Sequence, residues 1–345
     1  MDIEFHYYIT YLIAARAGFT PEDAKTLAHS CQYTDENNIL FSIDKGEPTE
    51  YFNYISQTMN ITRPRKELLR IYPLFHFIPG DPVAATARRK DGRLHRLNTT
   101  PDSENAKAVI DSALNSRNIY RIGIACHAYA DTFAHQNFVG YFDPFNSMKI
   151  LLDSKLAEVG HAEAEHKPDW PGLIWEDDRL HSSISLVSNR SRFKDAAAKL
   201  YGKLNNYLKP EIEPAEIIKE SKELLDDIDN AIGPEDEFNN LSDDRIKKYI
   251  ELTGLSQYGG QKLEIFNEEQ WLTEAFADSV FGFRLKVAQH IGDYIPLFHD
   301  FTWKDKEYYK RTHWYQFQEA VKEQQNCTWD ILNKSVFSGL ELDKL

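Results

Sequence analysis

The sequence is poor in cysteine and lacks the spacing that cysteine-based sites need. Its 345 residues include three cysteines, Cys31, Cys126 and Cys327. An odd number at such wide spacing argues against a disulfide framework. The chain also has no Cys-x-x-Cys pair, so sulfur ligation of zinc is not indicated.

Long hydrophobic runs are absent as well. No apolar stretch approaches the roughly 20 residues that a membrane-spanning helix needs. The first six residues, Met-Asp-Ile-Glu-Phe-His, contain neither the basic nor the apolar region of a signal peptide. We therefore expect a cytoplasmic protein without a transmembrane segment, and leave open export by a route that needs no cleaved signal.

Positive charge is scarce. The formal net charge is -14, and no basic run is longer than Arg88-Arg89-Lys90. An acidic chain repels phosphate backbones, so we expect no extended nucleic-acid surface. Bound divalent cations would reverse the local field, which keeps a phosphate-ester substrate compatible with this charge. The sequence does not identify protein partners.

What the chain does contain is a globular composition with helical periodicity. Hydrophobic residues make up 42% and charged residues 27%, which is enough apolar surface for a packed core. Strand signals are weak, and the fold class is predicted to be all-α. We expect a metal-binding helical core over residues 1–181 and a helical C-terminal part over 182–345, packed together as one unit. Apolar spacing and capping residues predict helices over 4–17, 21–33, 104–115, 117–138, 147–159, 190–208, 213–231, 242–253, 267–292 and 304–325.

The first chemical signal is a histidine-carboxylate pattern. Nine of the twelve histidines fall within residues 1–181. Among them, His127, Asp131 and His135 are spaced four and four, so a helix would stack their side chains on one face over two turns. Imidazole and carboxylate are ligands for one metal ion, or for two neighbouring ions with Asp131 between them. A hydrogen-bonded core triplet would show the same spacing.

A second group follows at residues 161–169. His161 and Glu165 repeat the spacing of four, and His166 and Asp169 come directly after them. Either Glu165 or the pair His166 and Asp169 would complete a second metal's shell. His6, Asp35 and His76, each taken alone, fit an ordinary core or turn position as well as a ligand position.

The segment His127-Ala-Tyr-Ala-Asp131-Thr-Phe-Ala-His135 resembles the HxxxDxxxH helix of the zinc-dependent phospholipase C superfamily, which also contains single-strand-specific nucleases. His161-Ala-Glu-Ala-Glu165 is similar to the later HxxxE pair of that superfamily. The chain also resembles an uncharacterised bacterial family over at least residues 1–200. That second likeness rests on Phe5-His6-Tyr7-Tyr8, Ser30-Cys31-Gln32-Tyr33-Thr34-Asp35, His76-Phe77-Ile78-Pro79-Gly80 and the two histidine segments.

The superfamily resemblance implies a multi-helix bundle that holds two or three zinc ions, here with additional C-terminal helices. His127, Asp131 and His76 would hold the first ion, and Asp35 would be a ligand or general base. His135, His161 and Glu165 would hold the second ion, and His6 would be a ligand of a third. Secreted phospholipases C use a free amino terminus as a ligand, whereas His6 is internal.

The activity implied is metal-dependent hydrolysis of a phosphodiester, with Asp35 and Asp131 as the catalytic carboxylates. Zinc with an open coordination position lowers the pKa of its water to about 7 and polarises phosphoryl oxygens. The substrate would be a lipid or a nucleotide, so a phospholipase C-like enzyme and a single-strand nuclease or nucleotidase are both open. A non-catalytic helical protein with a structural metal, and a non-haem iron enzyme, are two further hypotheses.

Overall fold

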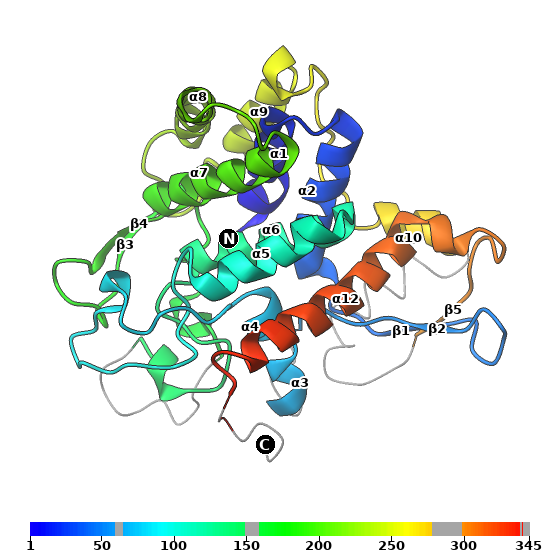
Figure 1. Ribbon diagram of the computed structural model, residues 1–345, viewed down its shortest axis with the longest axis horizontal. Coiled ribbons are helices and arrows are strands. Elements are labelled where there is room, and N and C mark those ends of the chain that lie inside the picture. Colours follow the sequence, from blue (N-terminus) through cyan, green and yellow to red (C-terminus); the bar gives the residue numbers. More distant parts are fainter. Residues whose placement is uncertain (59–64, 149–158, 278–298, 339, 341–345) are drawn as a thin grey trace.

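The computed structural model describes residues 1–58, 65–148, 159–277, 299–338 and 340 (Figure 1). The molecule is mostly helical, as expected. Its longer helices are α1 (Thr10–Ala17), α2 (Pro21–Glu36), α5 (Glu104–Ser116), α6 (Ile119–Ala134), α7 (Asn189–Leu208), α8 (Pro214–Ile232), α9 (Ser242–Thr253) and α12 (His313–Asn333). Shorter ones are α3 (Arg65–Leu69), α4 (Tyr72–Phe75) and α10 (Gln270–Ala275).

The N-terminal helices begin and end where the sequence places capping residues. A π-helical turn, η1 (Glu4–Ile9), leads directly into α1, and Gly18 ends α1 in the left-handed conformation with φ 115°. The Thr20 side chain then accepts a hydrogen bond from the Asp23 amide, and Pro21 occupies the first turn of α2. These local signals fix the direction of the two segments that carry His6 and Asp35.

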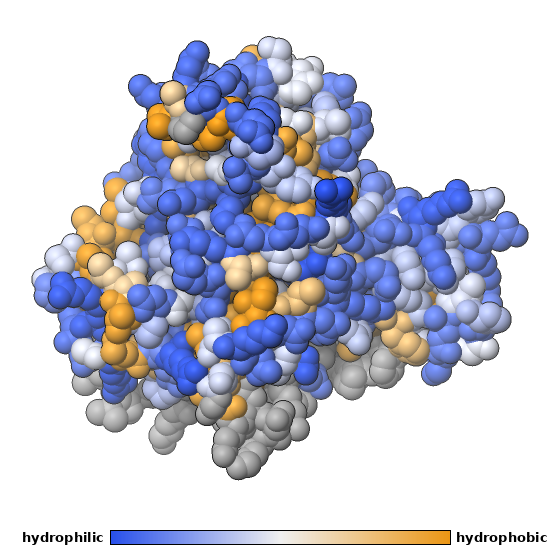
Figure 2. All heavy atoms as spheres, viewed as in Figure 1, coloured by the Kyte–Doolittle hydropathy of each residue, from blue (hydrophilic) through white to orange (hydrophobic). Residues whose placement is uncertain are grey.

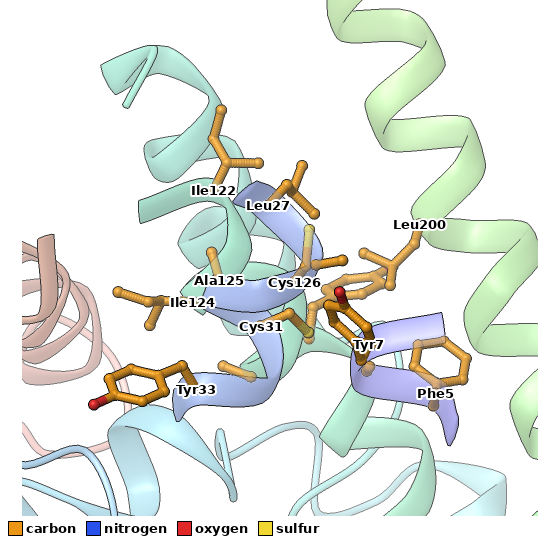
Figure 3. Close-up of a cluster of buried hydrophobic side chains, with 14 of the residues drawn as sticks. Phe5, Tyr7, Leu27, Cys31, Tyr33, Ile122, Ile124, Ala125, Cys126 and Leu200 are labelled. Carbon is orange, nitrogen blue, oxygen red and sulfur yellow. The ribbon is translucent and has the colours of Figure 1, made fainter. Parts of the chain in front are cut away.

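Helix α6 is the central element of the fold. It packs against α2, α5, α7 and α12, and every residue from Arg121 to Ala134 is buried. Gly123 permits the closest of these crossings, because a Cβ atom there would lie 2.4 Å from the Leu27 carbonyl oxygen of α2. Figure 3 shows the apolar side chains between α2, α6 and η1, including Cys31 and Cys126.

Two small sheets supplement the helices, which the prediction of an all-α fold missed. Strand β1 (Phe41–Ile43) pairs antiparallel with β2 (Tyr51–Phe52) and parallel with β5 (His299–Phe301). Strands β3 (Ile174–Glu176) and β4 (Leu186–Ser188) form a separate antiparallel pair. Each of these strands has two or three residues, too few to show a period of two in the sequence.

Several predicted helix boundaries were wrong. The helix predicted over 117–138 ends at Ala134, so His135 follows the helix instead of lying on it. The helix predicted from 304 begins at His313, because the Thr312 side chain caps it by accepting from the Tyr315 amide. Within the helix predicted over 267–292, the structure contains the short helix α10, which ends before Phe276 because the backbone of Phe276 is extended. Residues 278–292 lie outside the described part. Most of the helix predicted over 147–159 also lies outside the described part.

The C-terminal helices pack on the N-terminal ones around one hydrophobic core. Buried residues of α7 and α12, such as Leu200 and Phe317, belong to the same cluster as Phe5, Leu27 and Ile124. The face drawn in Figure 2 is largely hydrophilic, with apolar residues in small separate groups. No helix in the described part of the chain is long and apolar enough to cross a membrane.

Candidate metal centre

Eight of the ten residues predicted as metal ligands lie together at the C-terminal end of α6. Helix α6 contributes two of them, and the others come from η1, the end of α2, the residue after α4, the residue after α6, and the segment 161–169. Their nitrogen and oxygen atoms form one continuous cluster of contacts. The eight are His6, Asp35, His76, His127, Asp131, His135, His161 and Asp169.

Asp131 is at the centre of this cluster. Its Oδ2 atom lies 3.2 Å from His127 Nε2 and 3.3 Å from His76 Nδ1. Its Oδ1 atom points the other way, 3.2 Å from His6 Nε2. The carboxylate is buried, so its two oxygens can serve two neighbouring cations on opposite sides.

Asp35, His76 and His127 form the first ligand set, with donor atoms within 4.8 Å of one another. His127 Nδ1 lies 2.8 Å from the carbonyl oxygen of Cys31, and His76 Nε2 lies 2.9 Å from that of Ser56. A carbonyl only accepts, so both of these ring nitrogens carry the proton. In the neutral rings, His127 Nε2 and His76 Nδ1 would therefore carry lone pairs, and the two atoms lie 3.0 Å apart. Burial opposes protonation of His127, but Asp35 and Asp131 outweigh it and raise its pKa, so a proton fills this position more readily while no metal is bound.

The second ligand set, His135, His161 and Asp169, is built in the same way. His135 Nδ1 donates to the His76 carbonyl at 2.9 Å, and His161 Nδ1 donates to the Glu165 carbonyl at 2.8 Å. The remaining Nε2 atoms lie 3.2 and 3.6 Å from the two oxygens of Asp169. Backbone carbonyls thus fix both tautomers and turn the free nitrogens toward one carboxylate.

His6 and the amino nitrogen of Met1 flank Asp131 on its other side. The amino nitrogen lies 2.5 Å from Asp131 Oδ1 and 3.4 Å from Asp169 Oδ1. His6 is fully buried, and its Nε2 atom, 3.2 Å from Asp131 Oδ1, is not aligned for a hydrogen bond. An unpaired buried nitrogen is costly unless something occupies its lone pair. Burial lowers the pKa of the amino group, but Asp131 and Asp169 outweigh it and raise that pKa to about 11, so the group must lose a proton before it can bind a metal beside His6.

Cys31 also touches this side of the cluster. Its Sγ lies 3.6 Å from His6 Nδ1 and 3.8 Å from the Thr10 hydroxyl. Burial raises the pKa of the Cys31 thiol well above its usual value. While no metal is bound the thiol therefore stays protonated; with His6 and His127 it forms a further group whose donor atoms lie within 4.8 Å of one another, although the sequence predicted no sulfur ligand.

The charges of the cluster suit metal binding. Burial alone would raise the pKa of Asp131, but His135, the amino group of Met1, His127 and His6 outweigh it and hold that pKa well below its usual value. Burial also opposes ionisation of Asp169, yet His161, the amino group and His135 lower its pKa. Burial, reinforced by His127 and the amino group, lowers the pKa of His6 to about 4.

Glu165 and His166 do not join the cluster. The predicted helical spacing from His161 fails, because residues 162–164 form a single 3-10 turn and Glu165 follows with φ 54°. Both side chains are exposed, and Glu165 contributes its backbone carbonyl to His161 instead of its carboxylate. Asp169, which the sequence offered as the alternative to Glu165, is the carboxylate that the turn brings in.

Two side chains of the cluster are partly exposed to solvent. The Asp35 side chain is 28% exposed and that of His161 is 21% exposed, whereas those of His6, His127 and Asp131 are almost completely buried. Solvent therefore reaches one member of the first ligand set and one member of the second. A structural metal site has a closed shell, whereas a catalytic one keeps a position open.

The donors fit a group of divalent metal ions. His127 Nε2 and His76 Nδ1, 3.0 Å apart, repel each other unless a proton or a metal cation lies between them. Nitrogen and carboxylate donors suit zinc, and each histidine of the first two sets has the backbone hydrogen bond that orients metal-binding imidazoles. Sequence reasoning could not have found these carbonyl partners, because any residue type supplies them.

Comparison with known proteins gives a family match over most of the chain. The model of a family of unknown function, DUF6765, matches residues 1–332. No curated protein and no solved structure matches the chain.

Proposed function

The chain belongs to this family of unknown function, and we propose that it is a metal-dependent phosphoesterase whose cluster of histidines and aspartates holds two or three zinc ions. The observation that carries the proposal is the arrangement of lone pairs. His76, His127, His135 and His161 each donate one ring N–H to a backbone carbonyl and turn the other nitrogen toward Asp35, Asp131 or Asp169. A merely structural hydrogen-bonded core needs no such convergence of acceptors.

The residues divide among the ions by their contacts. Asp35, His76 and His127 would hold the first ion, and His135, His161 and Asp169 the second. Asp131 would bridge, with Oδ2 toward the first ion. Its Oδ1 and His6, beside the amino nitrogen of Met1, would hold a third. The likeness to the zinc-dependent phospholipase C superfamily supports this division, with Asp169 in place of the Glu of the HxxxE pair.

Zinc in such a site supplies a polarising charge for phosphoryl oxygens and a water of lowered pKa. The chain's own residues would do the rest. Asp35 is the most exposed carboxylate of the cluster and would accept the proton of the attacking water. Asp131, fully enclosed by donors, would keep the ions at a fixed separation. The substrate would be a phosphodiester of a lipid or a nucleotide.

The test is hydrolysis by protein loaded with zinc and carrying its affinity tag at the carboxyl end. Bis(4-nitrophenyl) phosphate reports phosphodiester cleavage, and phosphatidylcholine vesicles and short single-stranded oligonucleotides separate the lipid and nucleotide substrates. We expect turnover that a chelator abolishes, that Asp131→Asn lowers at least a hundredfold, and that His166→Ala, a control in an exposed neighbour, leaves unchanged. Zinc-loaded protein that cleaves none of the three substrates would indicate a structural metal site instead.

A further inference from the structure

A buried ion-pair network joins the N-terminal turn to α9. The guanidinium of Arg245 contacts both carboxylate oxygens of Glu4, with Nε 2.8 Å from Oε2 and Nη2 2.9 Å from Oε1. The Ser242 hydroxyl donates to the same carboxylate at 2.9 Å. Both charged side chains are almost completely buried. The two residues are 241 positions apart in the sequence, so this contact exists only in the folded chain.

A second arm of the network reaches the turn that carries Asp169. Arg245 Nη1 lies 2.9 Å from Asp236 Oδ2, and the Asp236 amide donates to the Gly172 carbonyl at 2.9 Å. Contact at Gly172 is close: a Cβ atom added there would lie 3.0 Å from the Asp236 Cβ and 3.4 Å from Arg245 Nη1. Gly172 is three residues after Asp169, so the same arginine is bonded to Glu4 and lies against the Asp169 turn.

These two segments supply the candidate ligands that lie farthest from the support of α6. Glu4 belongs to η1, two residues before His6 and three after Met1. Asp169 lies in a loop whose nearest helix is a single turn. His127 and Asp131, by contrast, are held by the hydrogen bonds of α6 itself.

We propose that Arg245 is a positioning residue of the metal centre, which through Glu4 places His6 and through Asp236 places Asp169. This inference rests on the proposed metal cluster. A buried ion pair stabilises a fold little more than apolar residues of the same volume would, so net stability is a weak reason for it. What it does supply is a fixed geometry, because a planar guanidinium bonds its partners in set directions. It also gives a role to the C-terminal half, which has no motif of its own.

The test compares metal content with fold stability in matched variants. Arg245→Gln removes both the positive charge and the planar guanidinium, while Arg245→Lys retains the positive charge but not the guanidinium. Arg121→Gln is the control: Arg121 is also a buried arginine joining the two halves, and although it lies in the first turn of α6, its partners Gln324, Glu323 and Ser112 lie in α12 and α5, which carry no candidate ligand. Each protein is loaded with zinc, and bound zinc, release to a chelator and the thermal midpoint are measured.

We expect Arg245→Gln to bind at least one zinc fewer per chain than the wild type, or to release zinc to the chelator at least tenfold faster. Arg121→Gln should bind as much zinc as the wild type, although its thermal midpoint falls by about as much as that of Arg245→Gln. Arg245→Lys should be intermediate. The single-arm variants Glu4→Gln and Asp236→Asn should each weaken one ion, and they keep the test valid if Arg245→Gln does not fold.

Two results would overturn the proposal in distinguishable ways. Wild-type protein that binds no zinc would remove the metal centre and the positioning role together. Wild-type protein with its full zinc, and Arg245 and single-arm variants that retain it as well as Arg121→Gln does, would overturn the positioning role alone.

Discussion

At the scale of single residues, Asp131 is the residue that connects the ligand groups of the proposed centre. Its oxygens face donor atoms of the first and third ligand groups, and Oδ2 also lies 3.6 Å from Nδ1 of His135, a residue of the second. We predict that Asp131→Asn binds at least one zinc fewer per chain than the wild type, because an amide is a weaker ligand and cannot balance the charge of two cations. Equilibrium dialysis against buffered zinc measures this; unchanged stoichiometry would refute the bridging role.

His29 gives a prediction that does not involve metal. It is buried against Trp271, with ring centroids 4.0 Å apart, and its Nε2 atom has no hydrogen-bond partner. Burial, followed by the charges of His313 and Lys25, lowers its pKa from 6.5 to about 3. In acid the unfolded chain therefore takes up a proton that the folded chain does not, so this residue's contribution to stability is lost as pH falls from 6.5 toward 3.

A group that binds one proton only in the unfolded chain lowers the free energy of unfolding by about 1.4 kcal/mol for each pH unit below its unfolded pKa of 6.5. Between pH 7.5 and pH 5 the free energy of unfolding of the wild type should therefore fall by about 2 kcal/mol more than that of His29→Phe. Urea unfolding of both proteins at the two pH values, in the presence of a chelator, gives the difference. Parallel losses in the two proteins would show that His29 is not held neutral.

At the scale of elements, the turn after residue 160 decides between two carboxylates. The single 3-10 turn leaves Glu165 exposed and brings Asp169 to His135 and His161. We predict that Asp169→Asn weakens binding of one zinc at least tenfold, whereas Glu165→Gln retains full affinity. Zinc titration with a competing fluorescent chelator distinguishes the pair. The opposite ranking would mean that the turn is helical when metal is bound.

The crossing of α2 and α6 offers a second prediction. Gly123→Ala would place a methyl group 2.4 Å from the Leu27 carbonyl, so α2 must move away from α6. Overpacking of this kind costs about 1–3 kcal/mol, and it would also shift Asp35 relative to His127. The matched control is Gly202→Ala in α7, where the added methyl meets nothing within 4 Å; it should stabilise the protein by up to about 1 kcal/mol. Thermal unfolding and zinc affinity of both variants check this.

Elements governed by neighbouring residues were predictable from the sequence. Capping by Thr20 and Ser103, together with apolar spacing, placed α2 and α5, and the predicted start at residue 117 lies two residues before the start of α6. The β1–β5 pairing was not predictable, because it joins three-residue strands more than 250 positions apart. For the same reason the sequence could not show that Glu4 meets Arg245.

The candidate site was predictable where one helix sets the spacing, as for His127 and Asp131. His135 belongs to the cluster although it lies beyond the helix, since the residue after the last turn continues in nearly the same direction. The choice of Asp169 over Glu165 depended on one left-handed residue, which no periodicity reveals. The superfamily resemblance implies an amino terminus at the site, but the sequence alone does not show that the amino nitrogen of Met1 lies beside Asp131.

At the scale of the whole molecule, bound metal should stabilise the fold. The ligands come from segments spread between residues 6 and 169, so an unfolded chain cannot assemble them. Each ion adds about 2.7 kcal/mol when free zinc is a hundredfold above its dissociation constant. We predict that a chelator lowers the thermal midpoint by several degrees and that added zinc restores it. A midpoint that is the same with and without chelator would argue against a multi-ion site.

The central claim is that this chain binds a cluster of zinc ions, and the most direct measurement is the number of metal ions per chain. Protein purified without added metal and without nickel resin is analysed by elemental mass spectrometry, beside His127→Ala and Asp131→Asn. The account predicts two or three zinc ions per chain in the wild type and fewer in both variants, with helical content preserved in circular dichroism. Wild-type protein that holds no metal, even after incubation with zinc, would contradict it.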